Sequence, residues 1–384
     1  MIIEDIQFIE DLEKPKTAPF HYSRVFKIIT DNGEILTPHK TTNRLEYNAR
    51  SGVPLLKKLS SEITSDFKLL DSKKIEAFMT DDKKGTQIIN LVKQFNDITR
   101  RSILRITIFQ PTSDVLARWN TPEKIKFAEY QAEYLQSKLG SNLITYPFLD
   151  LPISDYLAFI DSHHVRNEYQ STIFTLDMGM DPTYLKIILD HMAAKQEPMI
   201  IALIHKQWDK TIPQHIIVNS FFGNKKILFF ACQVGRKDKD SNTSNTHAIS
   251  VGSNFDIVAL SQGHGYPPND ELILNKIMFY SPSSLLIDNI ENTFSDPSRN
   301  IIKEFNLPMD NYLDLIHLNR IIKGYKGAEK HYKKYQILFY LARVHEAITS
   351  PIIFSQMRER ILQKDIIQHI NDTNLKNVPM IRGY

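Results

Sequence analysis

Cysteine is almost absent from this chain, which has a single one, Cys232, among its 384 residues. One thiol cannot form a disulfide within the chain, and it cannot supply the several thiolates of a cysteine-based zinc site. Because Cys232 lies within an apolar run, we expect it to be a small buried hydrophobic residue rather than a reactive thiol.

Long apolar runs are also missing, since no stretch approaches the roughly 20 residues that a membrane-spanning helix needs. The first residues, 1–6, are acidic early and lack the basic start and apolar core of a signal peptide. We therefore expect a soluble, cytoplasmic protein with no membrane partner.

Several sequence signatures of catalysis are absent as well. The chain has no H-E-x-x-H zinc motif, no phosphate-binding G-x-x-x-x-G-K-[ST] and no G-x-G-x-x-G. None of the apolar runs that are predicted to be strands ends in a lysine, as a Schiff-base mechanism at a strand end requires. The sequence therefore predicts no metal site and no cofactor.

Apolar material for a large core is abundant, because 42% of the residues are hydrophobic. This length and composition fit one large barrel or two to three ordinary domains. The formal net charge of +3 allows a nucleic-acid partner without demanding one, because solvated lysines are the ordinary source of such a charge.

Short apolar runs recur along the middle of the chain at intervals of about 26 to 30 residues. Five of them span residues 143–148, 172–176, 199–204, 227–232 and 256–260. Runs this short, separated by helix-length segments, are typical of buried parallel strands joined by crossover helices. Helices are predicted over residues 86–99, 121–139, 154–167, 181–195, 212–222, 247–255 and 269–280.

Three further runs extend this series to eight, at residues 67–70, 103–109 and 284–287. Eight βα units predict a (β/α)8 TIM-type barrel over residues 61–299, and an open doubly wound sheet with fewer strands is the alternative. In residues 1–60, Asn32-Gly33 predicts a β-hairpin, and a hairpin before a barrel commonly closes its N-terminal end. Residues 300–384 have a helical pattern and are expected to pack on the barrel.

Polar residues follow these runs, at the end of the strands where such folds place their chemistry. They are Asp71, Gln110, Asp150, Asp177, His205, Gln233, Gln262 with His264, and Asp288. Several carboxylates at one end of a barrel suit acid–base catalysis, nucleophilic attack or metal binding. Repulsion between them and burial raise the pKa of one carboxylate while another stays ionised. An aspartate after a strand also caps the next helix, which is the interpretation we favour for Asp150.

In order and in residue type, these segments resemble the tRNA-guanine transglycosylase superfamily, whose catalytic barrel exchanges a base in nucleic acid. Segment 33–38 (GEILTP) is similar to the family's opening G-x-[IL]-x-T-P hairpin, and segment 69–72 (LLDS) to its L-x-D-S-G-G element. Segment 232–235 (CQVG) is similar to V-Q-G-G, and segment 260–263 (LSQG) lies where the family has its G-G-L strand end. Lys73 and Lys74 replace the paired glycines of the family, and its cysteine-containing zinc site is absent.

The resemblance implies a double displacement in which Asp288 is the nucleophile and Asp71 moves protons; Asp296 is the alternative nucleophile. It also implies that Asp177 and Gln233 read the edge of the base. The predicted substrate-binding set further includes His205, Gly263 and His264. The partners expected on this basis are tRNA or DNA, a modified base of the 7-deazaguanine type found in queuosine and archaeosine, and a second copy of the chain in a homodimer.

Two other functions stay open. A barrel hydrolase or lyase acting on a small metabolite would use the same strand ends, with metal assistance through His205 and His264. A catalytically inactive barrel that serves as a binding subunit would suit the two lysines that follow Asp71-Ser72.

Overall fold

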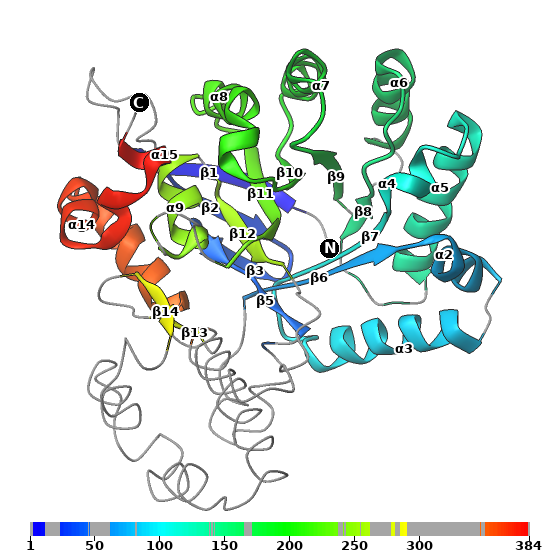
Figure 1. Ribbon diagram of the computed structural model, residues 1–384, viewed down its shortest axis with the longest axis horizontal. Coiled ribbons are helices and arrows are strands. Elements are labelled where there is room, and N and C mark those ends of the chain that lie inside the picture. The colour runs from blue at the N-terminus through cyan, green and yellow to red at the C-terminus, as the bar shows by residue number, and fades with distance from the viewer. Residues whose placement is uncertain are drawn as a thin grey trace, which may run out of the picture.

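The computed structural model describes residues 3–11, 24–44, 46, 62–80, 83–137, 139, 141, 143–164, 171–236, 241, 243–253, 255–261, 278–280, 285–289, 346 and 350–382. Parallel strands alternate with helices along most of this part of the chain, so the fold is mixed α/β (Figure 1). Among these residues, no helix is both long and apolar enough to cross a membrane.

A six-stranded sheet forms the centre of the fold. Its order is β4 (His39–Lys40), β12 (Ile257–Leu260), β11 (Ile227–Val234), β10 (Met199–Ile204), β9 (Thr172–Asp177) and β8 (Ile144–Tyr146). Every neighbouring pair is parallel, as strands joined by crossover helices must be. Within β10, Ile204 lies in register with Asp177 on one side and with Cys232 on the other.

A second, three-stranded parallel sheet consists of β5 (Thr42–Asn43), β6 (Ile63–Leu70) and β7 (Leu104–Pro111). Only Thr41 separates β4 from β5, so one short segment belongs to both sheets. The Thr41 amide donates to the Val258 carbonyl (2.9 Å), and its hydroxyl lies 2.6 Å from the Ser65 hydroxyl. Thr41 therefore connects β12 of one sheet with β6 of the other.

Polar contacts also join the opposite edges of the two sheets. The Gln110 side chain accepts a hydrogen bond from the Phe148 amide (2.9 Å) and donates one to the Phe148 carbonyl (2.9 Å). In β8, the Thr145 hydroxyl donates to the Thr107 carbonyl of β7. The two sheets therefore contact each other at both edges.

Helices occupy most connections between the parallel strands, close to where the sequence predicts them. They are α2 (Ser72–Met79), α3 (Lys83–Ile98), α4 (Ser113–Leu116), α5 (Thr121–Ser137), α6 (Ile153–His164), α7 (Pro182–Ala194), η2 (Trp208–Lys210), α8 (Ile212–Ser220) and α9 (Asn245–Gly252). At the start of α7, the Asp181 carboxylate accepts hydrogen bonds from the amides of Thr183 and Tyr184. Pro182 occupies the first helical position, where its missing N–H costs no hydrogen bond.

Both faces of the central strands are buried, as their continuous apolar runs predict. In β10, alternate residues pack under the helices, namely Met199, Ile201 and Leu203. The intervening residues, Ile200, Ala202 and Ile204, belong to a separate cluster on the inner face of the sheet.

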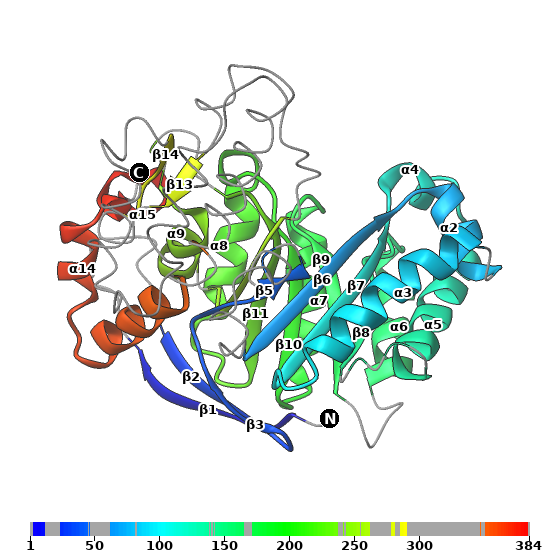
Figure 2. The same ribbon diagram turned by 90° about the horizontal axis from the view of Figure 1, so that it is seen from below.

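The N-terminal strands cover this inner face at the amino ends of the parallel strands. Strands β1 (Ile3–Asp11), β2 (Arg24–Thr30) and β3 (Gly33–Leu36) form an antiparallel sheet, and β2 and β3 are the hairpin that Asn32-Gly33 predicts. Gly33 has φ +139°, which side chains disfavour. Phe26 and Ile28 of β2 belong to the same inner cluster as Ile200. Figure 2 shows the hairpin below the parallel strands.

The described part of the C-terminal segment is helical. Residues 350–362 form a helix, followed by α14 (Ile366–Asp372), η5 (Asn374–Asn377) and α15 (Pro379–Arg382). Phe354 stacks on His247 of α9 with 4.5 Å between ring centroids, and Arg358 donates to the Pro38 carbonyl (2.8 Å). This segment thus packs against both α9 and the residues that lead into β4.

The prediction of an eighth parallel strand at residues 284–287 is wrong. Run 284–287 is expected to complete the parallel series, but β14 (Ile287–Asn289) pairs antiparallel with β13 (Met278–Tyr280) in a separate two-stranded sheet. Strand β13 also lies where a helix over residues 269–280 is predicted. The additional parallel segment is instead β4 and β5, inside the N-terminal segment 1–60. Its residues from His39 to Asn43 are all polar yet buried, so no apolar run marks them.

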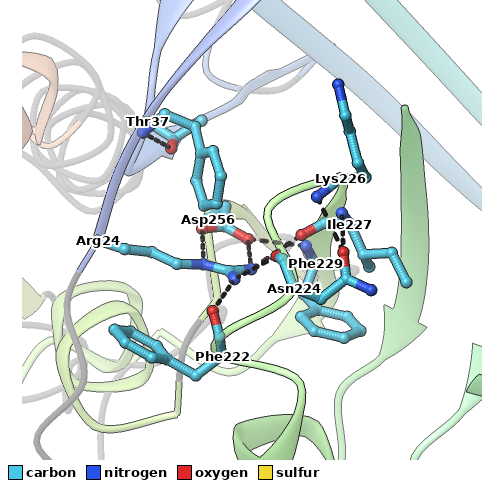
Figure 3. A network of polar contacts seen from close by, with 9 residues as sticks. Arg24, Thr37, Phe222, Asn224, Lys226, Ile227, Phe229 and Asp256 are labelled. Atoms are coloured by element: carbon cyan, nitrogen blue, oxygen red, sulfur yellow. Dashed lines mark hydrogen bonds and ion pairs between the residues drawn. The ribbon is translucent and has the colours of Figure 1, made fainter. Parts of the chain in front are cut away.

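A buried ion pair fixes β2 to the sheet (Figure 3). Arg24 binds both carboxylate oxygens of Asp256 at 2.9 and 2.7 Å, with both side chains almost fully buried. The remaining guanidinium donors reach backbone carbonyls, those of Phe222 (2.8 Å), Asn224 (3.2 Å) and Ile227 (3.0 Å). Asp256 also accepts from the Phe229 amide (2.9 Å). Burial raises the pKa of Asp256, and the charge of Arg24 opposes that shift.

Replacing Arg24 should strongly destabilise the protein. Arg24→Met leaves the buried Asp256 carboxylate without its cation, and we expect the free energy of unfolding to fall by about 3–5 kcal/mol. Urea denaturation measures this change. The matched control is Lys27→Met in the exposed pair Lys27–Glu34 (3.0 Å), which should cost less than about 1 kcal/mol. Equal effects of the two variants would contradict the prediction.

Candidate functional site

Asp177 ends β9 at the carboxyl edge of the six-stranded sheet. One carboxylate oxygen accepts a hydrogen bond from the Gly179 amide (2.6 Å), and the other lies 3.1 Å from the ammonium nitrogen of Lys206. The Asp177 side chain is 19% exposed and that of Lys206 45%. The carboxylate is therefore fixed in place and still reachable from solvent.

The turn after β9 is held from several sides. The Met178 amide donates to the Ile204 carbonyl (3.1 Å), and the Met180 amide donates to the Asp177 carbonyl (3.0 Å). Gln214 of α8 donates to the Met180 carbonyl (2.8 Å). A Cβ at position 179 would lie 3.1 Å from a carboxylate oxygen of Asp177, so glycine permits the close approach of backbone and carboxylate.

Gln233 lies at an irregularity near the end of β11. The pairing of β11 with β12 shifts register between Ala231 and Val234, and Gln233 has φ +61°. This bulge re-aims the side chain at the strand end. Gln233 is half-buried and lines a cavity of about 10 Å³ together with Phe67 of β6 and Phe230 of β11, which is room for about one water molecule.

Cys232 is buried, as the sequence predicts. Its Sγ lies 3.4 Å from the Leu203 carbonyl. Burial, and then the negative charge of Asp177, raise the pKa of the thiol far above its usual range, while Lys206 opposes the shift. The buried thiol therefore stays protonated, and the strand register places Cys232 level with Asp177 on the other side of Ile204.

His205 faces the helical layer rather than Asp177. Its amide donates to the Cys232 carbonyl (2.8 Å), and its ring lies 5.8 Å from that of His215 in α8. Burial lowers the pKa of His205 to about 4 and that of His215 well below its usual value. Both imidazoles are therefore neutral at pH 7. Within the described ranges, no group of three or more His, Cys, Asp or Glu residues is placed to hold a metal ion.

Asp71 is the N-cap of α2. One carboxylate oxygen accepts from the Lys74 amide (2.9 Å), and the other pairs with the Lys74 ammonium (2.9 Å). These contacts with Lys74 lower the pKa of Asp71. Its side chain is about half exposed, and none of the described contacts connects it to Asp177.

Asp288 belongs to β14, opposite Phe279 of β13, and not to the end of a parallel strand. Gly263, His264, Gln262 and Asp296 lie outside the described residues. The structure therefore brings together Asp177, Cys232 and the start of the bulge at Gln233. None of the described contacts connects this group to Asp288, the predicted nucleophile.

The remaining strand ends have structural roles. Gln110 joins the end of β7 to Phe148, in the segment that follows β8. Asp150 has φ +51°, and its carbonyl accepts a hydrogen bond from Lys124 (2.7 Å). The expectation that Asp150 caps the next helix is wrong, because α6 begins three residues later, at Ile153.

Sequence reasoning missed Lys206 and Gly179. After the apolar run of β10 the sequence predicts the first polar residue, His205, as the candidate. Side chains alternate along an extended segment, so His205 points to the face opposite Ile204, and Lys206 returns to the face that carries Asp177. Counting one residue further would have found it.

Neither a protein-family model nor a curated protein matches this sequence. Function must therefore be inferred from the geometry and chemistry of the site itself.

Removing the Asp71 carboxylate should reveal its capping role. We expect Asp71→Ala to lower the free energy of unfolding by about 1 kcal/mol, because the Lys74 amide loses its acceptor. Asp71→Asn, which keeps an acceptor oxygen, should cost less. Thermal denaturation of the three proteins measures these differences; unchanged stability of Asp71→Ala would show that the cap contributes nothing.

Buried histidines should make the protein sensitive to acid. A histidine whose pKa is lowered in the folded state binds fewer protons than in the unfolded chain, so its contribution to stability falls as pH drops from about 6.5 towards 4. Each such histidine contributes at most about 1.4 kcal/mol per pH unit. His215→Phe should therefore flatten the loss of stability over this range in urea titrations; a slope equal to wild type would contradict the assignment.

Proposed function

We propose that this protein is a base-exchanging enzyme of the transglycosylase type, whose base-binding site lies at the carboxyl edge of β9, β10 and β11. The observation that carries the proposal is the placement of Asp177 and Gln233. They follow strands separated only by β10, and Ile204 lies in register with both Asp177 and Cys232. Two strands with one between them are about 10 Å apart, a separation that lets the two side chains contact a bicyclic base bound beyond the end of β10 from either side.

The two residue types suit the edge of a heterocyclic base. A carboxylate accepts N–H groups, and an amide both donates and accepts hydrogen bonds. One oxygen of Asp177 is held by the Gly179 amide, so the carboxylate is oriented before a ligand arrives. Orientation of this kind lowers the entropic cost of binding.

We also propose that the two parallel sheets close into a (β/α)8 barrel. Contacts at both edges support this: Thr41 connects β12 with β6, and Gln110 connects β7 with β8. Apolar residues of both sheets share one inner cluster, among them Ile106 of β7 and Leu228 of β11. With β4 and β5 counted as one strand, the ring has the eight parallel strands that such a barrel requires.

The chemistry that the family resemblance implies is a double displacement. The Asp288 carboxylate attacks the anomeric carbon and forms a glycosyl ester, while the carbon–nitrogen bond breaks and the departing base keeps the bonding electrons and takes up a proton. A second base then attacks the same carbon, loses its proton and releases Asp288. The base of tRNA or DNA must leave its stack to enter such a site.

A binding barrel without transfer activity is the second candidate. The specific observation in its favour is Asp71, whose carboxylate is engaged by the start of α2 and by Lys74. A proton-transfer residue occupied in this way would have to break both contacts before acting on a substrate.

Exchange of a labelled base tests the proposal. Purified protein is incubated at low salt with tRNA or duplex DNA and labelled guanine or a 7-deazaguanine, and incorporation and a covalent adduct are measured. Asp288→Asn should abolish the adduct. Asp177→Asn should weaken base binding by about 10- to 100-fold, because a hydrogen bond to a charged group is lost.

The matched control is Asp190→Asn, which alters an exposed carboxylate on α7 paired with Lys186 and should leave exchange unchanged. Base binding without any adduct would support the non-catalytic barrel. An adduct that persists in Asp288→Asn would exclude Asp288 as nucleophile, and failure to bind either nucleic acid or base would overturn the proposal.

A further inference from the structure

Lys206 pairs with the Asp177 carboxylate oxygen that the Gly179 amide does not bind. The Gly179 amide holds the first oxygen at 2.6 Å, and the Lys206 ammonium lies 3.1 Å from the second. Both side chains are accessible, Lys206 at 45% and Asp177 at 19% exposure. A ligand that binds the second oxygen of Asp177 therefore meets this ammonium group.

The position of Lys206 is set by the fold around it. The His205 amide is bonded to the Cys232 carbonyl, which fixes the backbone immediately before Lys206. Its side-chain stem crosses the Gly179 backbone, since Cε and Cγ lie 3.6 and 3.9 Å from where a Cβ of residue 179 would be. A Cβ at position 179 would crowd the Asp177 carboxylate and would touch the Lys206 stem at van der Waals distance.

The pair offers a ligand two complementary groups side by side. The carboxylate can only accept hydrogen bonds, and the ammonium group can only donate them. Their charges balance, so the pair suits a neutral ligand that carries an N–H next to an acceptor. A cyclic amide has this arrangement, and its carbonyl oxygen has two lone pairs that can accept from an ammonium group.

We propose that Lys206 is a specificity-determining residue, which donates a hydrogen bond to the carbonyl oxygen of the bound base while Asp177 accepts from the adjacent ring N–H. The site then reads the cyclic-amide edge of a 6-oxopurine or a related bicyclic base. This inference rests on the proposed function, because it assumes that a base binds at Asp177.

Guanine and 6-thioguanine form a matched pair of probes. Both carry the ring N–H, and they differ only in that sulfur, a weak acceptor, replaces the carbonyl oxygen. Isothermal titration calorimetry on the full chain should give about tenfold tighter binding of guanine by the wild type, since one charge-assisted hydrogen bond is at stake. Lys206→Met, which keeps the apolar stem, should bind both bases equally, and Lys206→Arg should retain the preference.

Lys186→Met is the control, because Lys186 forms an exposed pair with Asp190 on α7 (2.6 Å) and should keep the tenfold preference. A preference that survives in Lys206→Met would overturn the assignment, as would tighter binding of both bases, which would mean that Lys206 only shields the carboxylate. If Asp177→Asn no longer binds either base in one of these two cases, the proposal that a base binds at Asp177 is retained and only the proposed role of Lys206 is excluded. A wild type that binds neither base would overturn the proposed function as well.

Discussion

The contact between Arg24 and Asp256 links parts of the chain that are far apart in sequence. A guanidinium group from β2 binds a carboxylate directly before β12, two carbonyls between α8 and β11, and the carbonyl of the first residue of β11. Because both charged groups are buried, each depends on the other for the hydrogen bonds it would otherwise make with water. The N-terminal hairpin is thereby held across the amino ends of the strands, and the opposite, carboxyl ends are left for polar side chains.

At those carboxyl ends, the parallel register is what creates a site. Asp177 and Cys232 both align with Ile204, so the residues that follow these strands emerge at the same level. The site differs from a set of independent surface charges because the Gly179 amide and Lys206 hold the Asp177 carboxylate. Asp177 and Lys206 together present an acceptor and a donor, and this pairing is the chemical basis of the ligand that we propose.

Much of the fold could be predicted from the sequence. Continuous apolar runs such as 199–204 indicated strands buried on both faces, and Asp181-Pro182 marked the start of a helix. The failures have a common cause. Strand β4–β5 consists of polar residues whose burial depends on partners such as Ser65, and the run ending at Ile287 is apolar although β14 is antiparallel. Local hydrophobicity reports burial, and it does not report the direction or partner of a strand.

The candidate site shows the same division. The sequence by itself determined that polar residues follow buried strands, and so Asp177 and Gln233 were among its candidates, because residue type and distance from an apolar run are local properties. The tertiary structure alone decided which of these residues meet. It places Asp71 at the N-terminus of α2, His205 next to His215, and Lys206 in contact with Asp177. Those outcomes depend on strand register and on side-chain direction, which are fixed only when distant segments pack together.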